Sequence, residues 1–403
     1  MNAVGIDVSK GKSMVCVMRP FGEIVASPFE VTHTGSELSE LAGKLKSLNG
    51  ETKVIMECTG SYHLPVAHSL QESGLTVCTV HAQLIHDFGN NTIRKVKTDK
   101  ADAIKIANYG LANWLDLSEY VPEDDMRHML KAYSRQYNKY TKIKTMLKNN
   151  LISLLDQTFP GVNELFTSPP RKRDGHEKWF DFATQFWHCQ CVCSLSQKTF
   201  VERYRKWCRR NGYYFNEAKA EDIYIESLGH FNIMPMNETA KLLITQAIAQ
   251  ISTIAESLAV CARGMKSLAE QLPEYSVVMG FHGVGNILCP QLMAEIGDVY
   301  RFARKESLVC YAGLEAPPNQ SGKFEAGSTG ISKKGSPHLR KALFQVMDCL
   351  LKLSPADDPV YQFLNRKRAE GKHYYSYMTA GSAKFLRIYY ARVTEFLDNL
   401  YED

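Results

Sequence analysis

Short apolar runs separated by glycines open the chain and predict a group of strands. Three such runs cover residues 3–9, 13–19 and 23–31, and Gly11 and Gly22 lie between them. Short strands with glycine at the turns are typical of an antiparallel meander. The chain is therefore expected to begin with three antiparallel strands.

Helical patterns then alternate with further strands. A helix opening at Gly35 places leucines on one face, a buried strand covers 53–57, and a second helix covers roughly 62–73. A strand at 75–80 and a helix opening at Asp99 follow. Three strands, then helix, strand, helix, strand and helix, predict a mixed sheet covered by helices.

Two long helical patterns occupy the middle of the chain. The first, within 121–159, carries seven basic residues and no acid between positions 127 and 148. Most are three or four residues apart, so they lie along one helix face: Arg127, Lys131, Arg135, Lys139, Lys142, Lys144 and Lys148. The second pattern, 237–272, has an isoleucine-rich face that includes Leu242. The two helices are expected to pair as an antiparallel coiled coil.

These patterns predict an α/β N-terminal domain followed by helical parts. The expected domains are 1–120 with the mixed sheet, 121–272 with the coiled-coil helices, and 273–403, which is mainly helical. An inserted module at about 160–235 separates the two long helices. It is rich in aromatic, cysteine and basic residues, and its role is open.

Composition narrows the class of protein. Of the 403 residues, 44% are hydrophobic and 23% charged, a globular balance, and the formal net charge is only +5. A nucleic-acid surface therefore requires a local concentration of cations. No apolar run reaches the roughly 18 residues of a membrane helix, and residues 1–7 do not form a signal peptide. Eleven cysteines without a Cys-x-x-Cys pair favour a reduced, cytoplasmic protein with no membrane partner.

Four carboxylates lie at informative places in the N-terminal pattern. Asp7 lies in the first strand, Glu57 ends a central strand, and Asp99 and Asp102 share one face where a helix opens. Each acid alone is explained as a strand end or a decorated helix start. As a set they repel one another unless a divalent cation binds between them, and Mg²⁺ prefers oxygen ligands. We therefore expect a metal site suited to phosphodiester chemistry.

A glycine turn and a serine-rich loop carry the candidate chemistry of the C-terminal part. Gly283 and Gly285 resemble a helix–hairpin–helix turn that approaches a phosphate, although an ordinary helix–helix turn explains them equally well. The loop 319–338 combines serines and glycines with candidate phosphate ligands Lys323, Lys333 and Lys334. One serine is a candidate nucleophile toward phosphorus; hydroxyls that only donate hydrogen bonds are the simpler alternative.

The basic helix and a cysteine cluster each have two interpretations. Cations along 127–148 either form a solvated face or bind a polyanion, and their mutual repulsion favours nucleic-acid contact. The candidates for that contact are Arg127, Lys131, Arg135, Lys139 and Lys142. Cys189, Cys191 and Cys193 depart from zinc-ligand spacing. On a strand they would share one face as small hydrophobic residues.

Motifs from both ends of the chain occur here in one combination. They cover residues 4–10, 56–60 and 97–103, and then 283–285, 311–314, 321–323, 331–335 and 339–340. Together they resemble the DEDD insertion-sequence transposases, a family that includes the Piv-type DNA invertases and the bridge-RNA-guided recombinases. The resemblance implies a RuvC-like, RNase H-type fold for the N-terminal domain and a C-terminal transposase domain.

The resemblance also implies roles for individual residues. The acidic tetrad would bind Mg²⁺ (or Mn²⁺): Asp7, Glu57, Asp99 and Asp102. A C-terminal serine would attack DNA and form a phosphoserine link, and Ser321 matches that position. Family members often have two glycines after this serine, whereas here Lys323 follows Gly322. Ser328 and Ser332 therefore stay as alternatives.

Partners follow from the same resemblance. In the family, the tetrad of one subunit works with the serine of another, in a dimer that forms a tetramer in the synaptic complex. Donor and target DNA pair with a structured non-coding guide (bridge) RNA. Sequence choice then lies in base pairing rather than in side chains that read bases. A cytoplasmic, nucleoid-associated prokaryotic protein is expected.

The working hypothesis is a site-specific DNA recombinase of an insertion sequence. A metal-dependent endonuclease similar to a Holliday-junction resolvase, without a covalent intermediate, is the first alternative. Residues 5–8 also resemble the first phosphate motif of actin-like ATPases and sugar kinases, but the further glycine-rich loops of those folds are missing before residue 280. A nucleic-acid-binding protein with a decayed active site is the third possibility.

Overall fold

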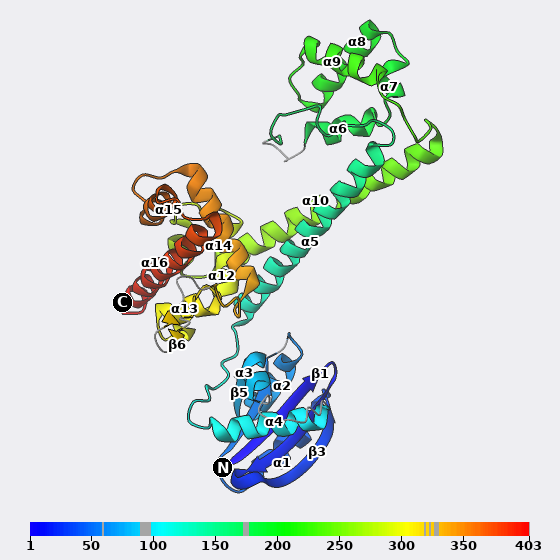
Figure 1. The fold of residues 1–403 in the computed structure, drawn as a ribbon. Coiled ribbons are helices and arrows are strands. Elements are labelled where there is room, and N and C mark those ends of the chain that lie inside the picture. The colour runs from blue at the N-terminus through cyan, green and yellow to red at the C-terminus, as the bar shows by residue number, and fades with distance from the viewer. Residues whose placement is uncertain are drawn as a thin grey trace. The chain divides into compact units, whose positions relative to one another are not determined.

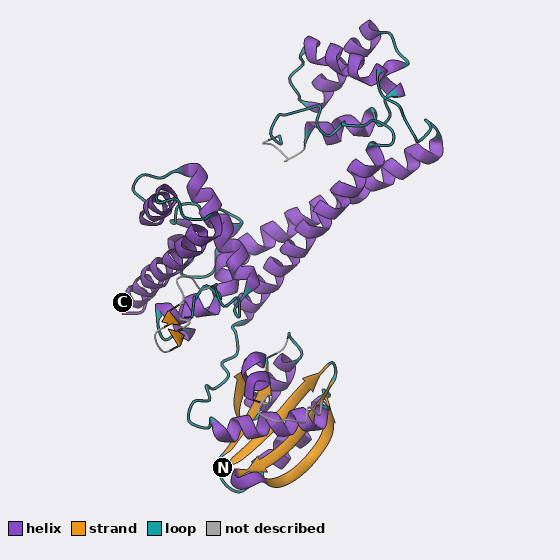
Figure 2. Cartoon of the chain, in the orientation of Figure 1, coloured by secondary structure: helices purple, strands orange, loops and turns teal. Residues whose placement is uncertain are grey.

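The computed structural model describes residues 1–58, 60–88, 98–171, 177–317, 320–321, 324–325 and 330–402, with the backbone alone described at 320, 321, 324 and 325. The chain divides into two compact units, Met1–Glu123 and Asp124–Asp403. Figure 1 shows the elements in chain order, and Figure 2 shows that strands concentrate in the first unit. Each unit is described by itself below.

A five-stranded mixed sheet forms the centre of the first unit. Its strands are β1 (Asn2–Ser9), β2 (Lys12–Arg19), β3 (Glu23–Thr32), β4 (Thr52–Glu57) and β5 (Thr76–Val80). They lie in the order β3-β2-β1-β4-β5. The first three strands are antiparallel, whereas β4 runs parallel to β1 and β5 parallel to β4. This confirms the expected antiparallel meander and the mixed sheet.

Helices cover both faces of this sheet. Helices α1 (Gly35–Lys46) and α2 (His63–Glu72) bury their apolar faces against one side, in a core with β1 and β4. Helices α3 (Ala82–Phe88) and α4 (Asp99–Ala112) cover the other side. The short helix α3 is absent from the sequence prediction, because its seven residues give too little periodicity to recognise.

Two long helices open the second unit. Helix α5 (Asp125–Leu155) and helix α10 (Glu238–Ala269) lie side by side (Figure 1). Leu130 of α5 shares one hydrophobic core with Met265 of α10, and Leu151 shares another with Ile244. The start of each helix therefore meets the end of the other, which confirms the antiparallel pair.

Helix α10 bears on the expectation about membrane-spanning segments. It is long and apolar enough to cross a membrane by length and composition alone. Both of its ends are packed in protein cores, as in the pair with α5. Leu242, expected on its buried face, is 59% exposed.

An aromatic core holds the inserted module between the two long helices. Its helices are α6 (Lys178–Gln185), α7 (Gln190–Cys193), α8 (Gln197–Asn211) and α9 (Glu217–Leu228). Rings of α8 stack in its core with those of neighbouring residues. The strand considered for the cysteine cluster is not formed, because residues 190–193 are helical. In the described part of the chain, no group of His, Cys, Asp and Glu forms a metal site, zinc included.

The C-terminal part is mainly helical, as predicted. Its helices are α11 (Tyr275–Met279), α12 (Leu288–Ile296), α13 (Lys305–Tyr311), α14 (Pro337–Leu353), α15 (Pro359–Ala369) and α16 (Tyr374–Glu402). A short hairpin joins β6 (Gln320–Ser321) to β7 (Phe324–Glu325). Short 3₁₀ helices occur at Pro20–Gly22 and Val299–Arg301. One hydrophobic core unites these C-terminal helices with the adjacent ends of the long pair.

Candidate active site

The register of the sheet places two acids at the ends of neighbouring parallel strands. Ile6 of β1 lies opposite Met56 of β4, so the next residues, Asp7 and Glu57, reach the same edge. Gly5 and Asp7 share one face of β1, because side chains alternate along a strand. That face is the one covered by α4. The sheet therefore presents both carboxylates toward α4.

Gly5 permits α4 to lie directly on β1. A Cβ at this position would overlap the Ala103 carbonyl and the Ala107 amide, and would lie 2.9 Å from the Ala107 Cβ. Only glycine lets the two backbones approach this closely. This role of Gly5 was not predicted from the sequence. The signal available was a glycine two positions before a strand acid, opposite a helix with small residues at 103 and 107.

The start of α4 is fixed by a cap. The Thr98 side chain accepts a hydrogen bond from the Ala101 amide at 3.2 Å. Asp99 and Asp102 consequently fall in the first helical turn, where the helix dipole stabilises carboxylates even without a metal. The close packing at Gly5 turns this first turn toward the strand acids.

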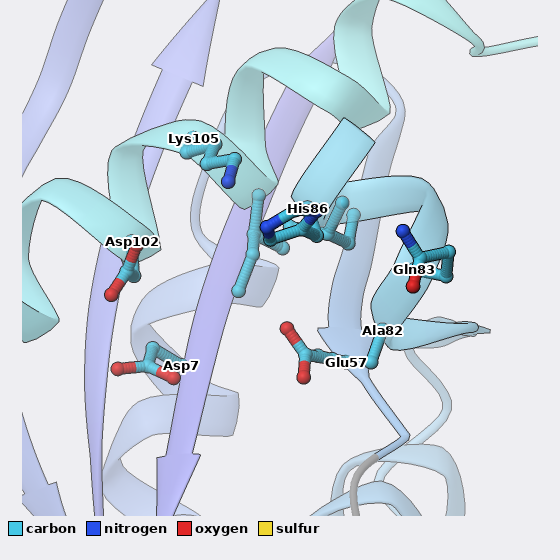
Figure 3. Close-up of a pocket in the computed structure, with 9 residues that line it drawn as sticks. Asp7, Glu57, Ala82, Gln83, His86, Asp102 and Lys105 are labelled. Atoms are coloured by element: carbon cyan, nitrogen blue, oxygen red, sulfur yellow. The ribbon is translucent and has the colours of Figure 1, made fainter. Parts of the chain in front are cut away.

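A cavity of about 410 Å³ lies where these elements meet. Figure 3 shows Asp7, Glu57 and Asp102 around it, with Lys105 on α4 and His86 on α3. Gln83, Ala82, Ile85 and Ile106 complete the lining. Lys105, His86 and Gln83 were missed from sequence, because β–α packing rather than sequence spacing brings them to the acids.

Mutual repulsion of the acids is visible at Asp7. The pKa of Asp7 is raised to about 6, mainly by burial and then by the charges of Asp102, Asp99 and Glu57, in that order. Asp99 does not line the cavity, yet its charge reaches Asp7. All four predicted acids thus act on one electrostatic environment. A bound cation would lower this pKa by favouring the ionised form.

The acids of the cavity are suitable ligands for a hard divalent cation, but they stand apart in the structure. Every acid supplies carboxylate oxygen, the ligand type that Mg²⁺ and Mn²⁺ prefer. Over the described residues, no three His, Cys, Asp or Glu side chains converge closely enough to hold an ion as they stand. Like charges favour such spreading, and a divalent cation would draw the carboxylates together. Asp7, Glu57 and Asp102 fit the metal by chemistry and by their shared cavity, and Asp99 fits it by chemistry.

The candidate serines belong to the second unit. The backbone of Ser321 pairs with that of Phe324 in the β6–β7 hairpin, and its side chain lies outside the described residues. Lys323 and Ser328 also lie outside them. The Ser332 hydroxyl accepts a hydrogen bond from the Lys334 amide at 3.2 Å. The structure therefore gives Ser332 a local structural partner.

The C-terminal end of the serine loop is anchored by buried groups. Glu295 of α12 is 1% exposed and accepts a hydrogen bond from the Ser336 hydroxyl at 3.0 Å. Its other oxygen lies 3.2 Å from the Arg135 guanidinium of α5. Arg340 donates to the carbonyls of Ala312 and Gly335 at 2.8 and 3.1 Å. These contacts fix the point where the loop enters α14.

The basic face of α5 has acidic partners that its own sequence does not show. Arg127 lies 2.5 Å from Glu274 in a buried ion pair, which raises the pKa of Arg127 against the effect of burial. Arg135 pairs with Glu295 as above, and Lys148 lies 2.7 Å from Glu177. The premise that this face lacks compensating acids is therefore wrong, and Arg127 stabilises the fold.

Contact of the remaining candidate residues with nucleic acid stays a prediction. Those on the α5 face are Lys131, Lys139 and Lys142. Gly283 has a positive φ of 76°, and a Cβ there would lie 3.0 Å from the Val346 carbonyl oxygen. Packing against α14 thus explains Gly283 without a ligand. A Cβ at Gly285 would meet nothing within 4 Å, so packing does not explain that glycine.

Two family models and two related proteins match most of the chain. Residues 4–160 match a DEDD family model of IS110 type described as a transposase, and residues 275–362 match a model described as the transposase IS116/IS110/IS902 family. Pilin gene-inverting proteins of Moraxella bovis and Moraxella lacunata are each 23% identical to the chain. Those alignments cover 85% of this chain and 80% of each relative.

Solved structures of a Holliday-junction enzyme also align with part of the chain. Thermus thermophilus RuvC in complex with a Holliday junction substrate is 12% identical, with a TM-score of 0.23. The alignment covers 30% of this chain and 99% of that one. A second Thermus thermophilus RuvC structure is 14% identical, with the same TM-score, and covers 30% of this chain and all of that one.

Proposed function

The chain belongs to the IS110 family of transposases, and on that premise we propose that it is the recombinase of an insertion sequence that cuts and rejoins DNA through a serine nucleophile. One observation carries the catalytic part of this proposal. Asp7, Glu57 and Asp102 come from three different elements and line one cavity, with the pKa of Asp7 raised by burial and by its acidic neighbours. Such an arrangement serves a phosphodiester site better than it serves stability.

The acidic tetrad of Asp7, Glu57, Asp99 and Asp102 would hold Mg²⁺ (or Mn²⁺). When bound, the metal supplies positive charge for the phosphodiester and for charge that develops in the transition state. Asp7 must be ionised to take part. Lys105 and His86 line the same cavity and offer donors to non-bridging phosphate oxygens.

In the proposed reaction, Ser321 exchanges one phosphoester bond for another. Its hydroxyl oxygen bonds to phosphorus, the bond from phosphorus to the leaving sugar oxygen breaks, and that oxygen takes up a proton as the serine loses one. A sugar hydroxyl of another strand then attacks the phosphoserine and releases Ser321. The number of phosphoester bonds is conserved, so rejoining needs no ATP.

Trapping the covalent intermediate tests the assignment of the serine. Nicked suicide DNA, supplied with any RNA that the protein requires, is expected to yield a protein–DNA adduct. Ser321→Ala abolishes the adduct, whereas Ser328→Ala and Ser332→Ala retain it. An undiminished adduct from Ser321→Ala overturns the assignment, and loss with one of the other variants moves it there.

The partners of this reaction are donor and target DNA, a structured guide (bridge) RNA, and further copies of the chain in a dimer and a tetramer. Family membership supports DNA as the substrate and a cytoplasmic place of action. To test RNA guidance, the chain is expressed with its native flanking DNA, and co-purifying RNA is sequenced. An enriched structured RNA supports guidance. Its absence from folded protein favours a protein-only invertase.

A metal-dependent endonuclease that acts on branched DNA is the second candidate. The observation in its favour is that the acidic cavity is formed wholly within the first unit, without the serine loop. This enzyme would release a free 5′-phosphate and leave no adduct. Analysis of the product ends separates it from the serine recombinase.

A further inference from the structure

The inserted module carries a charged surface that the proposed reaction does not use. Its helix α8 buries one face in the aromatic core through residues such as Phe200, Tyr204 and Trp207. The rest of α8 is exposed and contains six basic residues and one acid. The whole chain has a net charge of only +5. The charge excess of α8 is thus as large as that of the entire molecule.

Acidic side chains of α8 and α9 lie together on one flank of this helix. On the flank toward α9, Glu202, Glu217 and Glu221 line a cavity together with Lys198. Arg205 is compensated there, at 3.1 Å from Glu202 and 3.6 Å from Glu217. The acids near α8 therefore compensate cations on the α9 flank.

The other flank is the α8 cationic face, formed by Arg203, Lys206, Arg209 and Arg210. Arg203, Lys206 and Arg210 are three, four or seven positions apart, and Arg209 lies next to Arg210 and three positions from Lys206, so the four cover two helical turns. All four are exposed. Within the described ranges none forms an ion pair, and the one hydrogen bond of their side chains runs from Arg210 to the neutral Gln185 amide at 2.6 Å.

The helix dipole favours only two of these four cations. Arg209 and Arg210 lie in the last turn, where the helix dipole favours cations. Arg203 and Lys206 lie in the middle of the helix, three positions apart, where like charges repel each other. A polyanion would convert this repulsion into binding free energy through release of its counterions.

We propose that the α8 cationic face binds the phosphodiester backbone of a nucleic acid, at a contact separate from the catalytic cavity. Seven residues of helix span about 10 Å, the axial length of about three phosphates of one DNA strand. Three of the four cations are arginines, whose planar fork matches phosphate oxygens. The proposal goes beyond the recombination chemistry and does not depend on the serine.

Two matched double variants of the full chain test this contact. Arg203→Gln with Lys206→Gln removes one arginine and one lysine from the cationic face. The control, Lys198→Gln with Arg205→Gln, removes the same pair from the α9 flank of the same helix. Binding of labelled duplex DNA, duplex RNA and single-stranded RNA is measured by fluorescence anisotropy over a range of salt concentrations, and thermal unfolding checks the fold of each variant.

The face variant is expected to bind about tenfold more weakly than the control, and the slope of log K against log salt is expected to fall by roughly 2 on duplex DNA or 1.5 on a single strand. Weakening on DNA alone or RNA alone identifies the strand that α8 contacts. Equal affinity and slope in both variants on all three probes overturn the proposal. Asp7→Asn should retain this binding while it loses cleavage, so failure of the catalytic proposal is scored separately.

Discussion

At the scale of single residues, the ionised form of Asp7 that the proposed chemistry requires destabilises the metal-free folded protein. Its raised pKa means that the folded protein holds this proton more tightly than the unfolded chain does, so the stability of the metal-free protein falls as pH rises from about 4 to 6. Asp7→Asn removes the charge. It should abolish metal-dependent cleavage and yet stabilise the metal-free protein by about 1–2 kcal/mol at pH 7, after allowance for half-exposure.

Thermal unfolding with and without Mg²⁺ checks this prediction. The melting temperature of Asp7→Asn should exceed that of the parent without metal and respond less to Mg²⁺. Asp116→Asn, at an exposed acid of the same unit, serves as the control and should change neither value. A lower melting temperature for Asp7→Asn would contradict the electrostatic argument.

The same ionisation predicts a pH profile. Cleavage requires ionised Asp7, so the rate at low Mg²⁺ should rise through about pH 6 and then level off. Raising the Mg²⁺ concentration should move the midpoint to lower pH, because a cation favours the carboxylate. Rates measured across pH at several Mg²⁺ concentrations check this, and a midpoint independent of metal would speak against Asp7 as a ligand.

The sequence pattern singles out the acids but not the other residues that line their cavity. Asp7 and Glu57 are conspicuous because a carboxylate beside an apolar strand is costly. Lys105 and His86 look ordinary in sequence, and only the packing of α3 and α4 on the sheet brings them to the cavity. The acidic partner of Arg127 lies 147 positions away, at Glu274, so no local pattern reveals it.

At the scale of elements, the contact between β1 and α4 sets the geometry of the acidic cavity. Gly5→Ala should displace α4, destabilise the first unit by about 2–4 kcal/mol through overpacking against backbone, and abolish cleavage. Gly43→Ala in α1 is the control, because its Cβ would meet nothing within 4 Å. That variant should be neutral or up to about 1 kcal/mol more stable. Urea unfolding and a cleavage assay measure both, and an active, stable Gly5→Ala would refute the close contact.

Glu295 links α5, α12 and the serine loop. Glu295→Gln should weaken the ion pair with Arg135 and the hydrogen bond from Ser336. It should lower the free energy of unfolding by about 1–3 kcal/mol and reduce adduct formation by the serine. The stabilisation of the first unit by Mg²⁺ should be unchanged. Glu306→Gln breaks an exposed Glu–Arg pair of the same unit and should cost less than about 0.5 kcal/mol. Equal effects of the two variants would remove the anchoring role.

Elements with long or regular periods were predictable, and short ones were not. The five strands and the long helices follow from alternation and from helical spacing over many residues. The cysteine segment at 189–193 fits a strand as well as a helix, and the aromatic core around it decides in favour of a helix. In sequence, Tyr133 is one of several interleaved tyrosines on the basic helix, whereas in the structure its ring packs closely on Gly264 of α10.

At the scale of the whole molecule, the first unit has the features of an independent domain. It contains its own cores on both faces of the sheet. Residues 1–123 expressed alone should unfold cooperatively, and Mg²⁺ at about ten times its dissociation constant should stabilise them by about 1.4 kcal/mol. Calorimetry measures both effects. A fragment that does not fold would show that this unit requires the rest of the chain.

Hydrophobic patterns placed the end of the sheet domain at residue 120, and the structure divides the chain after Glu123. The patterns were less informative about the module. Its core is formed by aromatic side chains from several short helices together with ends of α5 and α10, so no single segment shows a complete apolar face.

The antiparallel pairing of α5 and α10 has a consequence for how such proteins diversify. The chain leaves the helix pair at Leu155 and returns at Glu238, on the same end of the pair. A segment whose ends are neighbours can be lost, gained or exchanged with only a short turn to close the gap. Leu151 and Ile244 would then need polar replacements, since the module covers them. This end of the helix pair is therefore a position where one module can replace another. Such an exchange would change the binding specificity and leave the rest of the protein unchanged.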